Sequence, residues 1–192
     1  MPINIPILLT WLRIILIPLL IAVYYLPESW LRLAERDLAA TLIFVVAAAT
    51  DWLDGYLARR WHQTSAFGAF LDPVADKLMV AATLIVLVQL GRLDAILAAI
   101  IIGREITISA LREWMARIGA HRSVAVSMIG KIKTTAQMIA IPLLLYYQPV
   151  LGVSAFEFGT WLIYIAAVLT LWSMGYYMRM AWPHLIEEDR RR

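Results

Sequence analysis

The chain of 192 residues contains no cysteine and only three histidines. The absence of thiols excludes disulfide bonds, zinc–thiolate centres and cysteine nucleophiles. His62, His121 and His184 have no metal-ligand spacing, so ordinary surface histidines are the simpler interpretation. Charge is also scarce, because Asp, Glu, Lys and Arg make up 16% of the residues, whereas a soluble domain has roughly 25%. The composition therefore argues against a soluble globular protein.

Apolar residues dominate the remaining composition. Hydrophobic residues make up 62% of the chain, and the mean hydropathy is +0.74. A helix needs roughly 20 apolar residues to cross a bilayer. Six segments approach that length, at about 7–26, 38–59, 67–90, 93–115, 132–147 and 158–180. We therefore expect an all-α integral membrane protein with six transmembrane helices in one bundle, in which residues 1–192 form a single domain.

Prolines and polar residues suggest where these helices end. Pro27 closes the first segment, and Pro183 follows the sixth just before a charged tail. Residues 103–105, Gly-Arg-Glu, interrupt the fourth segment. Arg13 lies inside the first apolar run, which no small-residue cleavage site ends, so we interpret this run as a retained membrane helix rather than a signal peptide.

Basic residues divide unevenly between the two ends of such a bundle. Six spans would put both termini on the same side. Arg32, Arg36 and Arg92 then fall near one face, and the other fourteen of the 17 Lys and Arg residues fall near the opposite face. The positive-inside rule makes that second face, and with it both termini, cytoplasmic.

Four aspartates stand out because polar residues at membrane depth are costly and by default indicate function. Helical steps of three and four place residues on one face of a helix. Two such sets are Asp51, Asp54, Gly55, Ala58 and Arg59 in the second segment, and Gly68, Asp72 and Asp76 in the third. If the two helices are antiparallel neighbours, all four carboxylates point into one cleft.

Four carboxylates cannot share a partly dehydrated cleft as bare anions, because they repel one another. Divalent cations resolve the conflict, and oxygen ligands without His or Cys suit Mg²⁺, Mn²⁺ or Ca²⁺. Paired metals of this kind clamp the attacking and leaving oxygens in phosphoryl chemistry. Gly55 and Gly68 would let a ligand approach the backbone, and Arg59 could bind a phosphate. The simpler alternative is that the aspartates are helix caps or solvated charges, with Asp72-Pro73 as an N-terminal cap.

The spacing D-x2-D-G-x2-A-R-x8-G-x3-D-x3-D resembles the signature of the CDP-alcohol phosphotransferase family. The matching positions are Asp51, Asp54, Gly55, Ala58, Arg59, Gly68, Asp72 and Asp76. The resemblance implies metal ligation by all four aspartates, with Asp76 also the general base, and a CDP site lined by Gly55, Ala58, Arg59 and Gly68. It further implies two Mg²⁺ or Mn²⁺ ions per site, a homodimer, and an active site that faces the cytoplasm.

Further stretches resemble the bacterial branch of the family that uses CDP-diacylglycerol and glycerol 3-phosphate, which implies a bacterial inner membrane. They include residues 67–77, 104–106, 109–114 and 130–137. The acceptor carries a phosphate, so a second cationic site is expected. Its candidates are Arg104, Arg112, Lys131 and Lys133. Each has an alternative: Glu105 could simply pair with Arg104, and the other three could be positive-inside residues.

The sequence is also compatible with other functions. The same chemistry could use inositol phosphate, serine or phosphatidylglycerol as the acceptor. A cation transporter could use the aspartates as its ion path, although their tight pairing near one face argues against a midplane site. A noncatalytic lipid-binding scaffold is a third alternative. Nucleic-acid binding is not indicated, because the basic residues border the membrane spans.

Overall fold

The computed structural model describes residues 5–61, 66–119, 128–149 and 152–191. Every regular element of appreciable length in these ranges is helical, as the sequence predicts. The helices are α1 (Ile5–Val23), α2 (Leu33–Arg60), α3 (Ala66–Gln89), α4 (Ala95–Arg117), α5 (Met128–Tyr146) and α6 (Ala155–Arg191). The expected turn between the second and third helices, near residues 62–65, lies outside the described residues.

Several helices differ from the sequence-based expectation in where they end or in whether they are interrupted. The fourth helix is not interrupted at Gly103, because Lys133 of α5 pairs with Glu105, which also pairs with Arg104. The sixth helix continues through Pro183, where neighbouring residues pack against α4. The first helix ends at Val23, short of Pro27.

Two more differences from the expectation concern where α2 and α3 begin. The second helix begins at Leu33, five residues earlier than expected. The Arg32 backbone N–H donates to the Glu35 carboxylate at 2.8 Å, which stabilises this first turn. The third helix begins at Ala66. Asp72 and Pro73 therefore lie inside it, and the interpretation of Asp72-Pro73 as an N-terminal cap is wrong.

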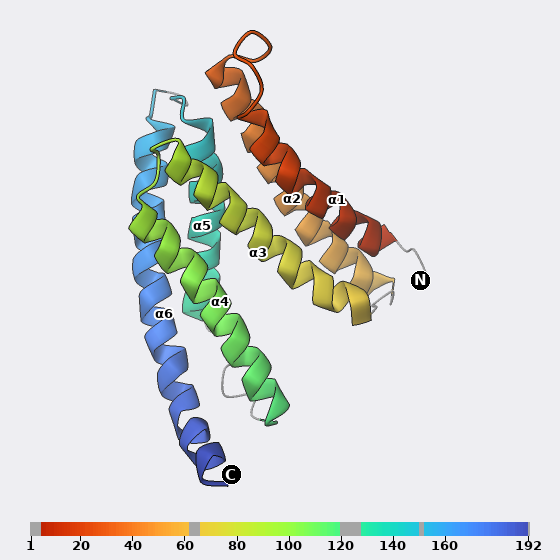
Figure 1. The fold of residues 1–192 in the computed structure, drawn as a ribbon, viewed down its shortest axis with the longest axis vertical. Coiled ribbons are helices and arrows are strands. Elements are labelled where there is room, and N and C mark those ends of the chain that lie inside the picture. The colour runs from red at the N-terminus through yellow and green to blue at the C-terminus, as the bar shows by residue number, and fades with distance from the viewer. Residues whose placement is uncertain (1–4, 62–65, 120–127, 150–151, 192) are drawn as a thin grey trace.

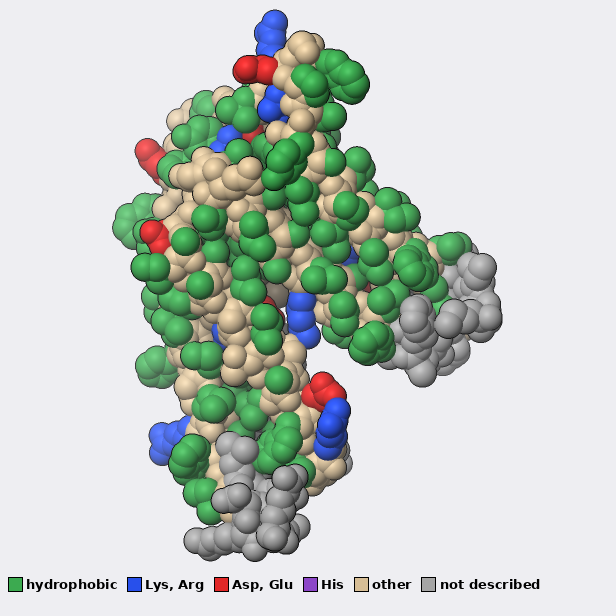
Figure 2. Space-filling view, viewed as in Figure 1, with side chains coloured by type: hydrophobic (Ala, Val, Ile, Leu, Met, Phe, Trp, Pro, Cys, Tyr) green, Lys and Arg blue, Asp and Glu red, His purple; other side chains and the backbone are tan. Residues whose placement is uncertain are grey.

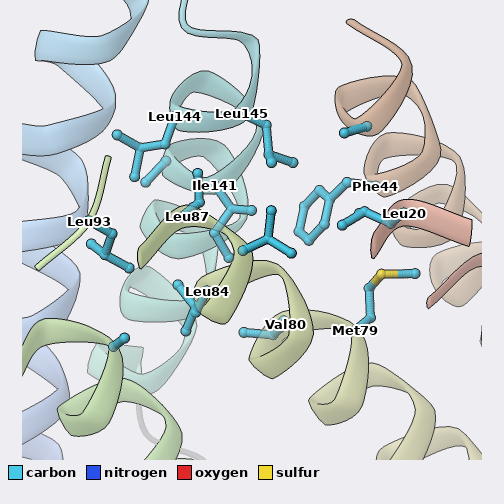
Figure 3. Close-up of a cluster of buried hydrophobic side chains, with 14 of the residues drawn as sticks. Leu20, Phe44, Met79, Val80, Leu84, Leu87, Leu93, Ile141, Leu144 and Leu145 are labelled. Atoms are coloured by element: carbon cyan, nitrogen blue, oxygen red, sulfur yellow. The ribbon is translucent and has the colours of Figure 1, made fainter. Parts of the chain in front are cut away.

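The helices form two groups joined by α3 (Figure 1). The first helix packs on both α2 and α3, while α6 packs on α5 and α4. The third helix crosses between the groups, and α2 also contacts α5. The main apolar core lies where these helices meet, with Phe44, Leu84 and Ile141 among its fully buried side chains (Figure 3). The aspartate-bearing end of α3 is thus held against α1 and α2.

Apolar side chains also cover the outside of the molecule (Figure 2). Two helical segments among the described residues, Leu33–Leu57 and Ala155–Pro183, are long and apolar enough to span a membrane. Two shorter apolar segments are Ile7–Val23 and Ile132–Tyr146. Large side chains such as Trp161 and Trp172 on α6 are about 70% exposed. An apolar surface of this extent is typical of a protein that is surrounded by lipid.

A buried ion pair fixes the end of the bundle where α1 connects to α2 and α3 to α4. The Arg92 guanidinium donates to both Asp37 carboxylate oxygens, at 2.8 and 2.9 Å. It also donates to the Leu145 carbonyl of α5 at 2.8 Å, and it lies 4.3 Å from the centre of the Tyr147 ring. The Tyr24 hydroxyl donates to Asp37 at 3.1 Å. This network joins α2, α5 and the α3–α4 connection.

Candidate active site

The two α2 aspartates face α1, where a buried arginine bridges them. The Arg13 side chain is 1% exposed. Its Nη1 lies 2.7 Å from Asp51 Oδ1, and its Nη2 donates to Asp54 Oδ2 at 2.5 Å. The Asp54 side chain is 4% exposed and that of Asp51 is 38% exposed. Asp51 therefore lies at the open side of the site, and Asp54 lies at its buried side.

The first helix also connects to the aspartates of α3. The Thr10 hydroxyl donates to Asp72 Oδ1 at 2.5 Å. Thr10 and Arg13 are three residues apart, so they lie on one face of α1. The Asp72 carboxylate is close enough to interact electrostatically with both Asp51 and Asp54. The aspartates of α2 and α3 thus come together around α1.

Asp76 lies one helical turn beyond Asp72 and connects this cluster to a cavity. Its carboxylate interacts electrostatically with Asp51 and with Glu105. The cavity has a volume of about 240 Å³. Its lining comes from α3, α4 and α5, and consists of Asp76, Lys77, Val80, Arg104, Glu105, Arg112, Thr134, Gln137 and Met138. Asp76 therefore borders both the acidic cluster and a pocket that carries several cations.

Two of the four basic residues predicted for the acceptor, Arg104 and Arg112, line this pocket, and Lys133 lies behind its wall. Arg104 is buried and donates to the Glu105 carboxylate at 2.9 Å and to the Ser173 hydroxyl of α6 at 3.3 Å. The buried Lys133 ammonium donates to the same Glu105 oxygen. Arg112 lines the pocket and lies 5.4 Å from the centre of the Tyr177 ring. The pairing of Arg104 with Glu105, which the sequence offered as the alternative, is therefore present. It leaves both residues on the pocket wall.

Of the predicted CDP-binding residues, Gly55 is partly buried on α2 and Gly68 is buried on α3. Ala58 and Arg59 continue the same stripe within α2. Their side chains, and that of Lys131 in α5, lie outside the described part of the molecule. The CDP site therefore remains a prediction.

The four aspartates match the implied metal in chemistry but not in arrangement. Among the described residues, no group of three acidic or histidine side chains is arranged to hold a metal ion. The chemistry nevertheless fits, since four carboxylates are the hard oxygen ligands that Mg²⁺ and Mn²⁺ prefer. The Arg13 guanidinium bridges two of them, which indicates that the cluster needs a compensating positive charge. A metal site formed by these aspartates remains a prediction.

Sequence reasoning missed Arg13, Thr10 and Gln137 as site residues. Arg13 gave one usable signal, because a charged residue inside an apolar helix requires a partner. Thr10 lies one turn before it on the same face. Gln137 lines the pocket, and its Oε1 atom is buried without a hydrogen-bond partner among the described residues. No spacing rule identifies such an isolated amide.

Comparison with known proteins identifies the family of this chain. The family model of CDP-alcohol phosphatidyltransferase matches residues 3–172. The chain belongs to this family, and is thus a transferase.

Its relatives narrow the class further. A protein of Escherichia coli (strain K12) is 52% identical over 190 residues, which cover 98% of this chain and all of the relative. Proteins of Shigella flexneri serotype 5b (strain 8401) and Shigella boydii serotype 4 (strain Sb227) match to the same extent. All three are named CDP-diacylglycerol--glycerol-3-phosphate 3-phosphatidyltransferase.

Proposed function

We propose that this chain transfers the phosphatidyl group of CDP-diacylglycerol to the sn-1 hydroxyl of glycerol 3-phosphate, giving phosphatidylglycerophosphate and CMP. The observation that carries the proposal is the pocket in which Asp76 meets Arg104 and Arg112, in a chain that is 52% identical to relatives named for this reaction. The pocket thus contains a carboxylate that can accept a proton and cations that can bind a phosphate.

The acceptor phosphate binds at the basic part of the pocket. Lys77, Arg104 and Arg112 line it, and Lys133 lies one contact away through Glu105. These cations outnumber the two carboxylates of the pocket, Asp76 and Glu105. Guanidinium groups bind phosphate oxygens through charge-assisted hydrogen bonds. Glu105 holds Arg104 on the pocket wall, and Lys133 pairs with Glu105 from behind, so an incoming phosphate meets a positioned guanidinium.

Asp76 acts as the general base. The acceptor hydroxyl oxygen forms a bond to the phosphorus that carries diacylglycerol, and the bond from that phosphorus to CMP breaks. The hydroxyl proton moves to the Asp76 carboxylate, and CMP leaves with the bonding electrons. No covalent enzyme intermediate is needed. General-base catalysis of this kind contributes roughly 10²–10⁴ in rate.

Asp51, Asp54, Asp72 and Asp76 would hold divalent cations, Mg²⁺ or Mn²⁺, two per active site. When bound, such cations supply positive charge that stabilises the diphosphate oxygens during transfer. Thr10 orients the Asp72 carboxylate by its hydrogen bond. Gly55, Ala58, Arg59 and Gly68 form the CDP site beside these aspartates. Their shared stripe on α2 and α3 supports this assignment.

The six helices all span the membrane, with both termini and the active site at the cytoplasmic face of a bacterial inner membrane. The distribution of basic residues and the exposed apolar surface support this arrangement. The start of α1 and the end of α6 both lie away from the α1–α2 and α3–α4 connections in Figure 1. The acyl chains of the lipid substrate then stay in the bilayer while its diphosphate reaches the aspartates. A homodimer, as the family resemblance implies, is part of this proposal.

The test is CMP release by the purified full chain in detergent with Mg²⁺ and CDP-diacylglycerol. Glycerol 3-phosphate, inositol phosphate, serine and phosphatidylglycerol are each offered as the acceptor. We expect CMP only with glycerol 3-phosphate. Release with another acceptor alone would contradict the acceptor assignment, and ion flux without CMP release would favour a transporter.

Asp94→Asn is a matched control for Asp76→Asn in this assay. Asp94 caps α4 at the opposite end of the molecule by accepting from the Ile96 N–H at 2.7 Å. Asn caps helices as well as Asp does, so Asp94→Asn keeps its activity. Asp76→Asn loses most of its turnover. A noncatalytic scaffold would tolerate both changes.

A further inference from the structure

Arg13 is an unusual residue for an acidic site, because its charge lies inside the cluster rather than at its edge. The guanidinium is almost fully buried and bridges Asp51 on α2 to Asp54 one turn later. It also interacts electrostatically with Asp76. The buried Nε has no hydrogen-bond partner within the described part of the chain, as is also the case for Nε of Arg104 and Arg112. Nη1 faces Asp51 only as an ion-pair partner.

Arg92 shows what a purely structural arginine looks like in the same molecule. It is buried and pairs with one aspartate, Asp37, through two hydrogen bonds. The Leu145 carbonyl accepts a further bond, and no buried nitrogen of Arg92 lacks a partner among the described residues. Arg13 instead divides its charge among several carboxylates, and its hydrogen bonding is incomplete. Its position is set by the negative charge around it rather than by a complete set of acceptors.

We propose that Arg13 is the internal counter-cation of the metal-free site and competes with the divalent cation for Asp51 and Asp54. The inference rests on the metal-dependent function proposed above. A guanidinium and a metal ion repel each other when both contact the same two carboxylates. Arg13 therefore keeps the acidic cluster folded without metal, and it weakens the binding of metal that arrives alone.

The competition makes metal binding depend on the donor substrate. A diphosphate brings new oxygen ligands for the metal and offers Arg13 a replacement anionic partner. Both effects favour the state in which the metal, and not Arg13, is held by Asp51 and Asp54. The positioning role of Arg13 is thus to make the metal bind tightly only when a CDP group is present.

Binding of Mn²⁺ to the full chain in detergent, followed by the electron paramagnetic resonance signal of free Mn²⁺, tests the proposal without lipid or acceptor. In Arg13→Gln, which removes the competing charge, the Mn²⁺ dissociation constant falls by about tenfold or more, since a buried cation no longer has to leave its partners. Added CDP lowers the dissociation constant strongly in the wild type and less in Arg13→Gln. A chelator lowers the melting temperature of Arg13→Gln more than that of the wild type.

Arg92→Gln is the matched control, because it also removes a buried arginine from an aspartate. It lowers the melting temperature with or without metal and leaves the Mn²⁺ affinity unchanged. An Arg13→Gln protein that binds Mn²⁺ no more tightly than the wild type would overturn the proposal, and so would an equal effect of Arg92→Gln on affinity. If Arg13→Gln is not recovered folded, the Mn²⁺ affinity of Arg13→Lys tests the proposal instead. Its single ammonium bridges the two carboxylates less well, so Mn²⁺ binds several-fold more tightly, and unchanged affinity overturns the proposal.

These measurements are independent of the proposed reaction. The wild type can release CMP from CDP-diacylglycerol and glycerol 3-phosphate even if Arg13 does not compete with the metal. Conversely, Mn²⁺ binding can respond to Arg13→Gln even if the acceptor is a different alcohol. The two failures are therefore distinguishable.

Discussion

Replacing Arg92 by glutamine should destabilise the whole bundle, because it leaves the Asp37 charge buried at the opposite end from the active site. The change removes two hydrogen bonds to Asp37, one to the Leu145 carbonyl and the contact with the Tyr147 ring. Only the Tyr24 hydroxyl, at 3.1 Å, remains among the described partners of the Asp37 carboxylate. Removing one partner of a buried ion pair lowers the free energy of unfolding by about 3–5 kcal/mol. For a chain of this size, that corresponds to a fall in melting temperature on the order of 10 °C.

Thermal unfolding in detergent, followed by tryptophan fluorescence, measures this loss. The double variant Arg92→Met with Asp37→Leu is the decisive comparison, since replacing both charges by apolar groups removes the unpaired charge. It should recover most of the stability that Arg92→Gln loses. The reasoning would be refuted by an Arg92→Gln protein within about 1 kcal/mol of the wild type, or by a double variant as unstable as the single one. CMP release before heating should be unaffected in both, because the pair does not contact the candidate active site.

Three further predictions concern the site itself. Asp76→Asn should lower kcat by roughly 10²–10⁴ with little change in KM for glycerol 3-phosphate, as loss of a general base requires, and steady-state CMP release at saturating Mg²⁺ and CDP-diacylglycerol measures both constants. Arg104→Gln should raise KM for glycerol 3-phosphate about tenfold or more, because it removes a charged donor from the phosphate site. The exposed Arg117, paired only with Glu113 on the same helix, provides the control in Arg117→Gln, which should leave KM unchanged. Removal of divalent cations by a chelator should abolish CMP release, added Mg²⁺ should restore it, and activity that persists after chelation would contradict a metal-dependent reaction.

The existence of the helices could be predicted because it depends mainly on local sequence. Long apolar runs give α3 within one residue and α4 within two residues of their expected bounds. The helical stripes of aspartates follow from steps of three and four residues, and the structure places them on α2 and α3 around α1. These features need no knowledge of which helices are neighbours.

Other features depend on partners that are distant in the sequence. The polar residues at 103–105 suggested a break in the fourth helix. The break is absent because Lys133, 28 residues away, pairs with Glu105. The position of α1 between the two aspartate helices is likewise a tertiary property. An ion pair across 41 positions, from Arg13 to Asp54, leaves no periodic signal in the sequence.

Two buried arginine–aspartate contacts of similar length therefore have different consequences in one fold. The Arg92 guanidinium pairs with a single carboxylate and also donates to main-chain carbonyls of α5. Its position is therefore fixed, and the pair contributes to stability. Arg13 faces a cluster of carboxylates, and its buried Nε has no hydrogen-bond partner among the described residues. In the sequence, Arg13 lies inside an apolar run and Arg92 lies between two such runs. The number of acidic neighbours that the fold brings to each arginine decides its role. In the competition proposed above, a site that exchanges cations requires this incomplete bonding, because a fully bonded Arg13 would exclude the metal.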